Sequence, residues 1–253
     1  MDLISVIMPF YKKREYFSES FESVINQTYN NIEIFVVYDD TDHQDLDFVR
    51  KLVYNENRAT LILNDKNLGV SKSRNIAIKR ARGKFLAFID CDDIWLPNKL
   101  ELQYELMKKH DLRISYTNYK IINHKNEVIG ENISNKKICY KELINSCDIG
   151  LSTVMILKDV FKISDFKDIK TKEDYALWLE LSRKGEKFVC LEKSLTLWRK
   201  LKNSLTSSFR DKLINGFLVY YKFEKKNLLL SLFLVINLGL HYVKKTINQK
   251  KNL

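Results

Sequence analysis

Residues 84–93 read KFLAFIDCDD, an apolar run that ends in three carboxylates within four residues. The run follows Gly83 and is too short for a helix, so it predicts a buried strand. Two earlier segments have the same character, residues 3–8 and residues 32–38. Strands that are apolar along their whole length are typical of a parallel sheet that is covered on both faces.

Helical patterns separate these strands. Apolar residues recur at spacings of three and four in residues 16–27, 46–53 and 71–81, while residues 60–63 add a further short strand. This alternation predicts an α/β fold with a mostly parallel sheet flanked by helices. Beyond it, the patterns predict helices at 99–109 and 172–184, strands at 113–118, 150–157 and 188–191, and a helical C-terminal extension after residue 206.

Polar groups stand at the carboxyl ends of the predicted strands. Pro9 and Tyr11 follow the first, Asp39 and Asp40 the second, and residues 90–93 the fourth. Ligands of open α/β sheets bind outside the carboxyl ends of the strands. The sequence therefore predicts a binding site that gathers these residues.

The acidic segment at residues 90–93 has two interpretations. Three neighbouring carboxylates suit a hard divalent cation such as Mg²⁺ or Mn²⁺, and they also suit a solvated acidic turn. Asp39 and Asp40 could likewise bind a base or ribose, or simply form a turn. Neither a G-x-G-x-x-G motif after the first strand nor a phosphate-binding P-loop motif is present, which argues against nicotinamide enzymes and P-loop nucleotidases.

Glu173 and Asp174 begin the predicted helix at 172–184. Acids in a first turn often do no more than complement the helix dipole. This helix is unusually apolar after Asp174, so it is expected to be buried and to hold that carboxylate in a pocket, where it could act as a general base.

Charge is concentrated at the C-terminal end. Twelve of the 43 Lys and Arg residues, but only two of the 32 acids, lie in residues 199–253, so the rest of the chain is nearly neutral. Residues 227–243 are strongly apolar and have paired lysines on both sides. This pattern predicts a helix that lies on an anionic membrane surface, and the alternative is a helix packed on the catalytic body. No secretory signal or zinc spacing is evident, so a cytoplasmic protein is expected.

An ordered set of motifs resembles glycosyltransferase family 2 along residues 1–207. The motifs are S-V-I-M-P at 5–9, Q-T-Y at 27–29, I-E-I at 32–34, D-D at 39–40, N-L-G at 67–69, S-R-N at 73–75, G-K-F at 83–85, D-C-D-D at 90–93, W-L-P-N-K-L at 95–100 and E-D-Y at 173–175. The resemblance implies a GT-A fold, with a nucleotide-sugar-binding half at 1–97, an acceptor half at 98–207 and an appended tail at 208–253. It also implies an inverting, metal-dependent transfer from a nucleotide sugar, expected to be a UDP-sugar.

The resemblance assigns roles to individual positions. Pro9, Tyr11 and either Asp39 or Asp40 would hold the nucleoside, with Arg74 nearby. Asp90 would face the ribose, Asp92 would bind Mn²⁺ or Mg²⁺, and Asp174 would be the catalytic base. Arg199 and the segment at 204–206 would close over the diphosphate.

The chain departs from the family pattern at three places. Phe10, Tyr11 and Lys12 stand where the family often has Thr-Tyr-Asn, and the second strand end lacks the usual Gly-Ser, which leaves the choice between Asp39 and Asp40 open. Leu201 replaces a histidine, so Arg199 or Lys202 would act without it.

The expected partners are a nucleotide-sugar donor, a glycan or lipid-linked glycan acceptor of surface polysaccharide assembly, and the cytoplasmic face of a membrane. The alternative is a scaffold with the same fold that binds nucleotide sugars without turnover. A nucleic-acid partner is disfavoured because the basic tail interleaves lysines with leucines instead of aromatic stacking residues.

Overall fold

A computed structural model describes the backbone of residues 1–201 and 209–251. Within them, ten strands form one sheet in the order β3-β2-β1-β4-β9-β6-β10-β5, with β7 beside β6 and β8 beside β10. The strands are β1 (Ile4–Phe10), β2 (Ile32–Tyr38), β3 (Ala59–Leu63), β4 (Phe85–Phe88), β5 (Ile94–Trp95), β6 (Ile114–Ile122), β7 (Val128–Asn132), β8 (Lys137–Ile138), β9 (Met155–Leu157) and β10 (Phe188–Arg199).

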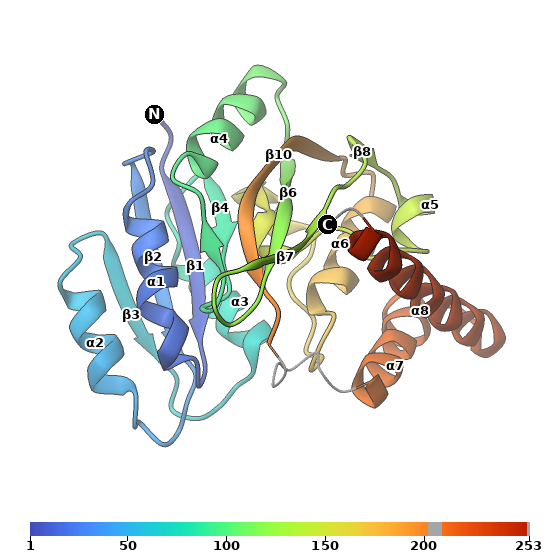
Figure 1. Ribbon diagram of the computed structural model, residues 1–253, viewed down its shortest axis with the longest axis horizontal. Coiled ribbons are helices and arrows are strands. Elements are labelled where there is room, and N and C mark those ends of the chain that lie inside the picture. The colour runs from blue at the N-terminus through green and yellow to red at the C-terminus, as the bar shows by residue number, and fades with distance from the viewer. Residues whose placement is uncertain (202–208, 252–253) are drawn as a thin grey trace.

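Helices cover both faces of this sheet (Figure 1). They are α1 (Arg14–Ile25), α2 (Leu46–Tyr54), α3 (Val70–Arg80), α4 (Lys99–Lys109), α5 (Tyr140–Leu143), α6 (Glu173–Arg183), α7 (Phe209–Leu218) and α8 (Leu228–Lys251), with short turns η1 (Leu151–Thr153), η2 (Lys158–Lys162) and η3 (Val219–Phe223). Strands β3, β2, β1 and β4 pair in parallel, as do β6 and β10, whereas β9 is antiparallel to both of its neighbours, β4 and β6. The predicted α/β class with a mostly parallel sheet is confirmed.

The core divides into two hydrophobic clusters, one on each face of the sheet. Along β1, Val6 and Met8 point into a cluster with residues of α1, α2 and α4, whereas Ile7 points into the other cluster with residues of α3 and α6. Every residue of β1 is buried, as the continuous apolar run predicts.

The strands differ in extent from the sequence prediction. The first strand continues through Pro9 to Phe10, because its pairing with β4 ends at Ile7 and the missing N–H of Pro9 interrupts no bond on that side. The strand expected at 150–157 is instead the 3-10 turn η1 followed by the short β9. Strand β10 runs well beyond the expected 188–191, to Arg199, because it pairs with β6 and β5 along its length.

The C-terminal helices pack against α5 and α6 at the end of the molecule opposite α2 and β3 (Figure 1). Tyr220 of η3 lies 2.8 Å from the hydroxyl of Tyr175 in α6, and its own hydroxyl donates to the carbonyl of Ile144 at 2.9 Å. On α8, Leu234, Val235 and Leu238 are buried in the same cluster. Over the described part of the chain, none of the helices combines the length and apolarity that a bilayer crossing requires.

Candidate active site

Arg74 of α3 joins the two acidic segments that the sequence singled out. Its guanidinium donates to Asp90 at 2.6 Å and to Glu173 at 2.5 Å, and only 3% of its side chain is exposed. Burial alone would lower the pKa of Arg74, but these two carboxylates keep it above the usual value. The end of β4 and the start of α6 are therefore held to one arginine, and Arg74 and Glu173 are 99 residues apart in the sequence.

Asp174 lies in the first turn of α6, beside this bridge. Its Oδ1 accepts a hydrogen bond from the backbone N–H of Tyr175 at 2.7 Å. Burial, and then the charge of Glu173, raises the pKa of Asp174 to about 7, with the positive charge of Arg74 acting in the opposite direction. A carboxylate with such a pKa takes up a proton readily near neutral pH, as a general base must.

The three carboxylates after β4 have different surroundings. Asp93 is fully buried, where it accepts hydrogen bonds from Ser152 Oγ at 2.5 Å and from the backbone N–H of Arg199 at 2.9 Å. Burial and the neighbouring Asp92 raise the pKa of Asp93 well above the ordinary value. Asp92 is 17% exposed, and its Oδ2 lies 3.3 Å from Lys13 Nζ. Burial and the charge of Asp90 raise the pKa of Asp92.

These surroundings fit a divalent cation that is held through one protein carboxylate. Asp93 is buried and bonded to Ser152 and the backbone, and one oxygen of Asp90 is bonded to Arg74, whereas Asp92 is paired with Lys13 and remains partly exposed. Among the residues described, no three His, Cys, Asp or Glu side chains converge as a complete metal cage. Mg²⁺ is commonly bound through one or two carboxylates together with substrate phosphates, and this loop can supply that donor set.

Asp39 organises the neighbouring N-L-G loop. Its Oδ1 accepts from Asn64 Nδ2 and from the backbone N–H of Leu68, both at 2.8 Å, and its Oδ2 accepts from Gly69 N at 2.9 Å. Gly69, which has a φ of +85°, precedes α3, so this carboxylate helps to fix the helix that carries Arg74.

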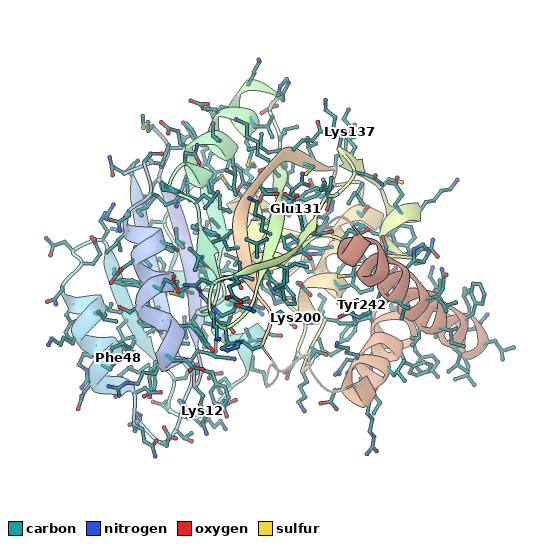
Figure 2. The ribbon with its side chains drawn as sticks, in the orientation of Figure 1. Lys12, Phe48, Glu131, Lys137, Lys200 and Tyr242 are labelled. Carbon is teal, nitrogen blue, oxygen red and sulfur yellow. The ribbon has the colours of Figure 1, made fainter. Side chains whose placement is uncertain are left out.

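Asp40 has different neighbours from Asp39. Its Oδ1 accepts from the backbone N–H of Thr41 at 2.8 Å, and the residue lines an open hollow of about 690 Å³. Lys12 and Phe48 line the same hollow, at the end of the sheet where β1 to β3 stop (Figure 2). Of the other predicted nucleoside residues, Pro9 is buried within β1 and Tyr11 is 37% exposed just beyond it.

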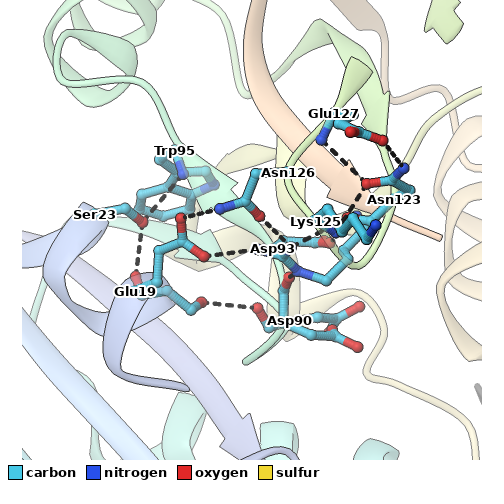
Figure 3. A network of polar contacts seen from close by, with 12 residues as sticks. Glu19, Ser23, Asp90, Asp93, Trp95, Asn123, Lys125, Asn126 and Glu127 are labelled. Atoms are coloured by element: carbon cyan, nitrogen blue, oxygen red, sulfur yellow. Dashed lines mark hydrogen bonds and ion pairs between the residues drawn. The ribbon is translucent and has the colours of Figure 1, made fainter. Parts of the chain in front are cut away.

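Arg199 is engaged by the protein itself. Only 1% of its side chain is exposed; the guanidinium donates to Asp92 O at 2.8 Å, to Glu19 Oε2 at 2.9 Å and to Asn126 Oδ1, and it lies over the ring of Tyr16. Figure 3 shows Glu19 and Asn126 pointing toward one another, and the amide of Asn126 donates to Glu19 Oε1 at 2.7 Å. In this arrangement Arg199 ties the acidic loop to α1 and to the β6–β7 hairpin. Lys202 and the segment at 204–206, also expected near the diphosphate, lie outside the described residues.

Three residues at the candidate site were not predicted from the sequence: Ser152, Lys13 and Glu19. Ser152 Oγ donates to Asp93 and accepts from the backbone N–H of Asp90. It lies in the short turn η1, where no periodic pattern of the sequence marks a site residue. Lys13 lies beside the acidic loop in the structure. Its place just after the first strand, at the same edge of the predicted sheet as that loop, is the signal that could have identified it. Glu19 faces the site from α1, where its charge looks like that of any solvated helix residue.

Comparison with known proteins finds relatives over most of the chain. The family model described as glycosyl transferase family 2 matches residues 5–166. The chain is 39% identical over 179 residues to the UDP-Glc:alpha-D-GlcNAc-diphosphoundecaprenol beta-1,3-glucosyltransferase WfgD of Escherichia coli, a match that covers 71% of this chain and 69% of WfgD.

Two solved structures have the same fold. The structure of TarS residues 1–349 from S. aureus, in complex with UDP-GlcNAc, superposes with a TM-score of 0.68 at 20% identity, covering 85% of this chain and 66% of that chain. The mannosyltransferase PcManGT of Pyrobaculum calidifontis, in complex with GDP-Man and Mn²⁺, gives a TM-score of 0.67 at 14% identity, covering 88% and 64%. This chain therefore spans about two thirds of each of these structures, and the likeness concerns the fold.

Proposed function

The chain belongs to glycosyltransferase family 2, and from that premise we propose that it transfers a sugar from a UDP-sugar to a lipid-linked glycan acceptor, with inversion at the anomeric carbon. The observation that carries this proposal is the Arg74 bridge, which sets the acidic strand end beside the half-buried Asp174. WfgD, whose name states a UDP-glucose donor and a diphosphoundecaprenol-linked acceptor, supports the choice of substrates.

Asp174 is the base in this proposal. Its carboxylate removes the proton from the acceptor hydroxyl, whose oxygen forms a bond to the anomeric carbon of the donor. The bond from that carbon to the diphosphate breaks on the opposite side, and its electron pair leaves with the diphosphate. One displacement needs one base, and a base of this kind typically contributes about 10²–10⁴-fold to the rate.

The donor lies along the carboxyl ends of β1, β2 and β4 in this proposal. Asp40 is favoured over Asp39 for the nucleoside base, because both oxygens of Asp39 are already bonded to the N-L-G loop. Pro9 and Tyr11 would border the same nucleoside site. Arg74 would then act near the nucleotide chiefly by orienting Asp90, which would face the ribose.

A divalent cation, Mn²⁺ or Mg²⁺, would be held by Asp92, and when bound it would offset the charge that develops on the leaving diphosphate. The Mn²⁺ in the PcManGT complex supports this choice of cofactor. Lys13 would share the task, because its ammonium group already lies 3.3 Å from Asp92. Arg199 would act through the loop it holds, since its guanidinium donates to the carbonyl of Asp92.

The C-terminal helices would place the enzyme on the cytoplasmic face of a membrane. One side of α8 is buried against the body, while Leu229, Phe233 and Ile236 on the other side are 79%, 63% and 61% exposed. Lys222 and Lys225 precede this surface and are also exposed. An apolar helix face with lysines beside it suits an interface with anionic lipids. Both expectations for the tail, packing and membrane contact, can thus apply to opposite faces of one helix.

The test is transfer by the purified chain to a GlcNAc-diphospholipid, with a panel of nucleotide sugars and with Mn²⁺, Mg²⁺ or a chelator. We expect one donor to be used, and we expect activity to be lost with chelator and in Asp92→Asn and Asp174→Asn. Asp168→Asn is the matched control, because that carboxylate is 71% exposed and pairs with Lys72 on the surface. Wild-type activity in Asp174→Asn would refute the role of the base. Donor binding without any turnover would favour the scaffold alternative.

A further inference from the structure

Helix α7 contacts the segment that leads into the base. Asn215 of α7 is buried, and its Nδ2 donates to Thr171 Oγ1 at 3.0 Å. One turn earlier on the same helix, Asp211 pairs with Lys170 Nζ at 2.7 Å. The C-terminal helices are thus attached to two of the three residues that immediately precede α6 and its Asp174.

The residue between this attachment and α6 has an unusual backbone. Lys172 has φ 67° and ψ 23°, in the left-handed region that residues with a Cβ rarely adopt. Such a conformation persists only where its surroundings hold it, and it fixes the direction in which the next helix begins. Gly216 of α7 lies against it, since a Cβ at Gly216 would be 4.0 Å from Lys172 Cε.

Helix α3 holds the chain shortly before this segment. The side-chain amide of Asn75 donates to the carbonyl of Phe166 at 2.8 Å and accepts from its backbone N–H at 3.2 Å. Arg74, the preceding residue, binds Glu173. The start of α6 is therefore positioned between α3, from the donor half, and α7, from the C-terminal extension.

We propose that Asn215 and Thr171 are positioning residues for Asp174: their hydrogen bond sets the left-handed turn at Lys172 and so the direction of the catalytic carboxylate. This goes beyond a membrane contact as the role of the C-terminal helices, and it rests on the proposed function of Asp174 as the base. The C-terminal extension thus has two roles: α8 presents exposed leucines and phenylalanine, and α7 positions the catalytic carboxylate.

The test compares kinetic constants of full-length variants with the lipid-linked acceptor. In Asn215→Ala and Thr171→Val the hydrogen bond is lost, and we expect kcat to fall about tenfold or more, because a small displacement of a catalytic group costs much of its effect. The KM for the donor stays unchanged, since no donor contact is altered. Thr171→Ser keeps the hydroxyl and retains wild-type kcat, and the double variant is no slower than either single one.

The matched control is Asn237→Ala. It removes another amide hydrogen bond between the extension and the body, from Asn237 Nδ2 to Asn145 Oδ1 at 2.7 Å, which does not touch the segment before α6. We expect its kcat to equal that of the wild type. An equal loss in Asn237→Ala and Asn215→Ala, or wild-type kcat in Asn215→Ala, would overturn the positioning role. Either result would leave the proposed function standing, provided that Asp174→Asn remains inactive.

Discussion

At the scale of single residues, the behaviour of Asp174 can separate chemistry from folding. Replacement by Asn removes the base, and we expect transfer to fall about 10²–10⁴-fold. Transfer by the wild type is expected to rise with pH through about 7, because the carboxylate must be ionised to accept a proton. A pH–rate profile measured between pH 5 and 9 checks this expectation, and a flat profile would count against it.

The same substitution has an opposite effect on stability. Folding raises the pKa of Asp174 from 3.8 to about 7, so the folded state favours the protonated form. The stabilisation from this group is fully present below its unfolded pKa and is lost as the pH rises through about 7. At pH 8 we therefore expect Asp174→Asn to increase the free energy of unfolding by on the order of 1–3 kcal/mol. Urea unfolding at pH 5 and pH 8 measures it, and the gain must be smaller at pH 5.

Arg74 illustrates how much one buried ion contributes. In Arg74→Met the side chain of Glu173, which is 11% exposed, keeps its charge without its partner. Breaking a buried pair in this way typically costs about 3–5 kcal/mol. We expect a loss of that order in urea unfolding, and a milder loss in Glu173→Gln, which leaves Arg74 still paired with Asp90. Equal losses in the two variants would show that the bridge acts mainly through Glu173.

At the scale of elements, the sequence predicted those whose pattern depends on local packing. Helix α4 has the predicted bounds, Lys99–Lys109, because its periodic apolar residues, such as Leu100 and Met107, face one core cluster. The strands whose partners lie far away in sequence were less well predicted. Strand β10 contains charged residues at its middle, Glu192 and Lys193, and it is a strand through that region because β6 pairs with its two ends.

As with the elements, only part of the candidate site could be predicted from the sequence. The acidic strand ends follow from parallel strands that stop at one edge, so Asp39, Asp40 and Asp90 could be placed from pattern alone. The partners of Arg199 could not, because Glu19 and Asn126 come from segments 180 and 73 residues away and carry no local signal. Only the packing of the hairpin against α1 brings them to the guanidinium.

The β6–β7 hairpin depends on Asn126 for this attachment. Asn126 has φ 66°, donates to Glu19 Oε1 at 2.7 Å and accepts from Arg199. Asn126→Gly keeps the backbone conformation but loses the amide, whereas Asn126→Ala also adds left-handed strain of roughly 1–2 kcal/mol. We expect faster hydrogen exchange of β7 amides in both variants, and more so in Asn126→Ala. Lys125→Ala, at the exposed tip, serves as the control and leaves the exchange unchanged.

At the scale of the whole molecule, α7 and α8 lie together at one end (Figure 1), α8 carries exposed apolar side chains, and the C-terminal part of the sequence is basic. We expect the protein to bind vesicles that contain anionic lipids, and Leu229→Ser with Phe233→Ser to weaken that binding about tenfold or more, since burying each such side chain contributes about 1.5–3 kcal/mol. Tyr54→Ser, which alters a 68% exposed residue of α2 at the opposite end of the molecule (Figure 1), should bind as the wild type does. Co-sedimentation at low and high salt measures both effects, and equal losses in all variants would argue against a defined face.

The Arg199–Glu19 ion pair joins residues 180 positions apart in the chain, and the Arg74–Glu173 pair joins residues 99 apart. Contacts of such separation form late during folding, because long loops must close before they contribute. During refolding from urea, secondary structure is therefore expected to recover before the capacity for sugar transfer does. A nascent chain would likewise form both pairs only after Arg199 has been synthesised, so that synthesis itself would delay the enzyme's first turnover.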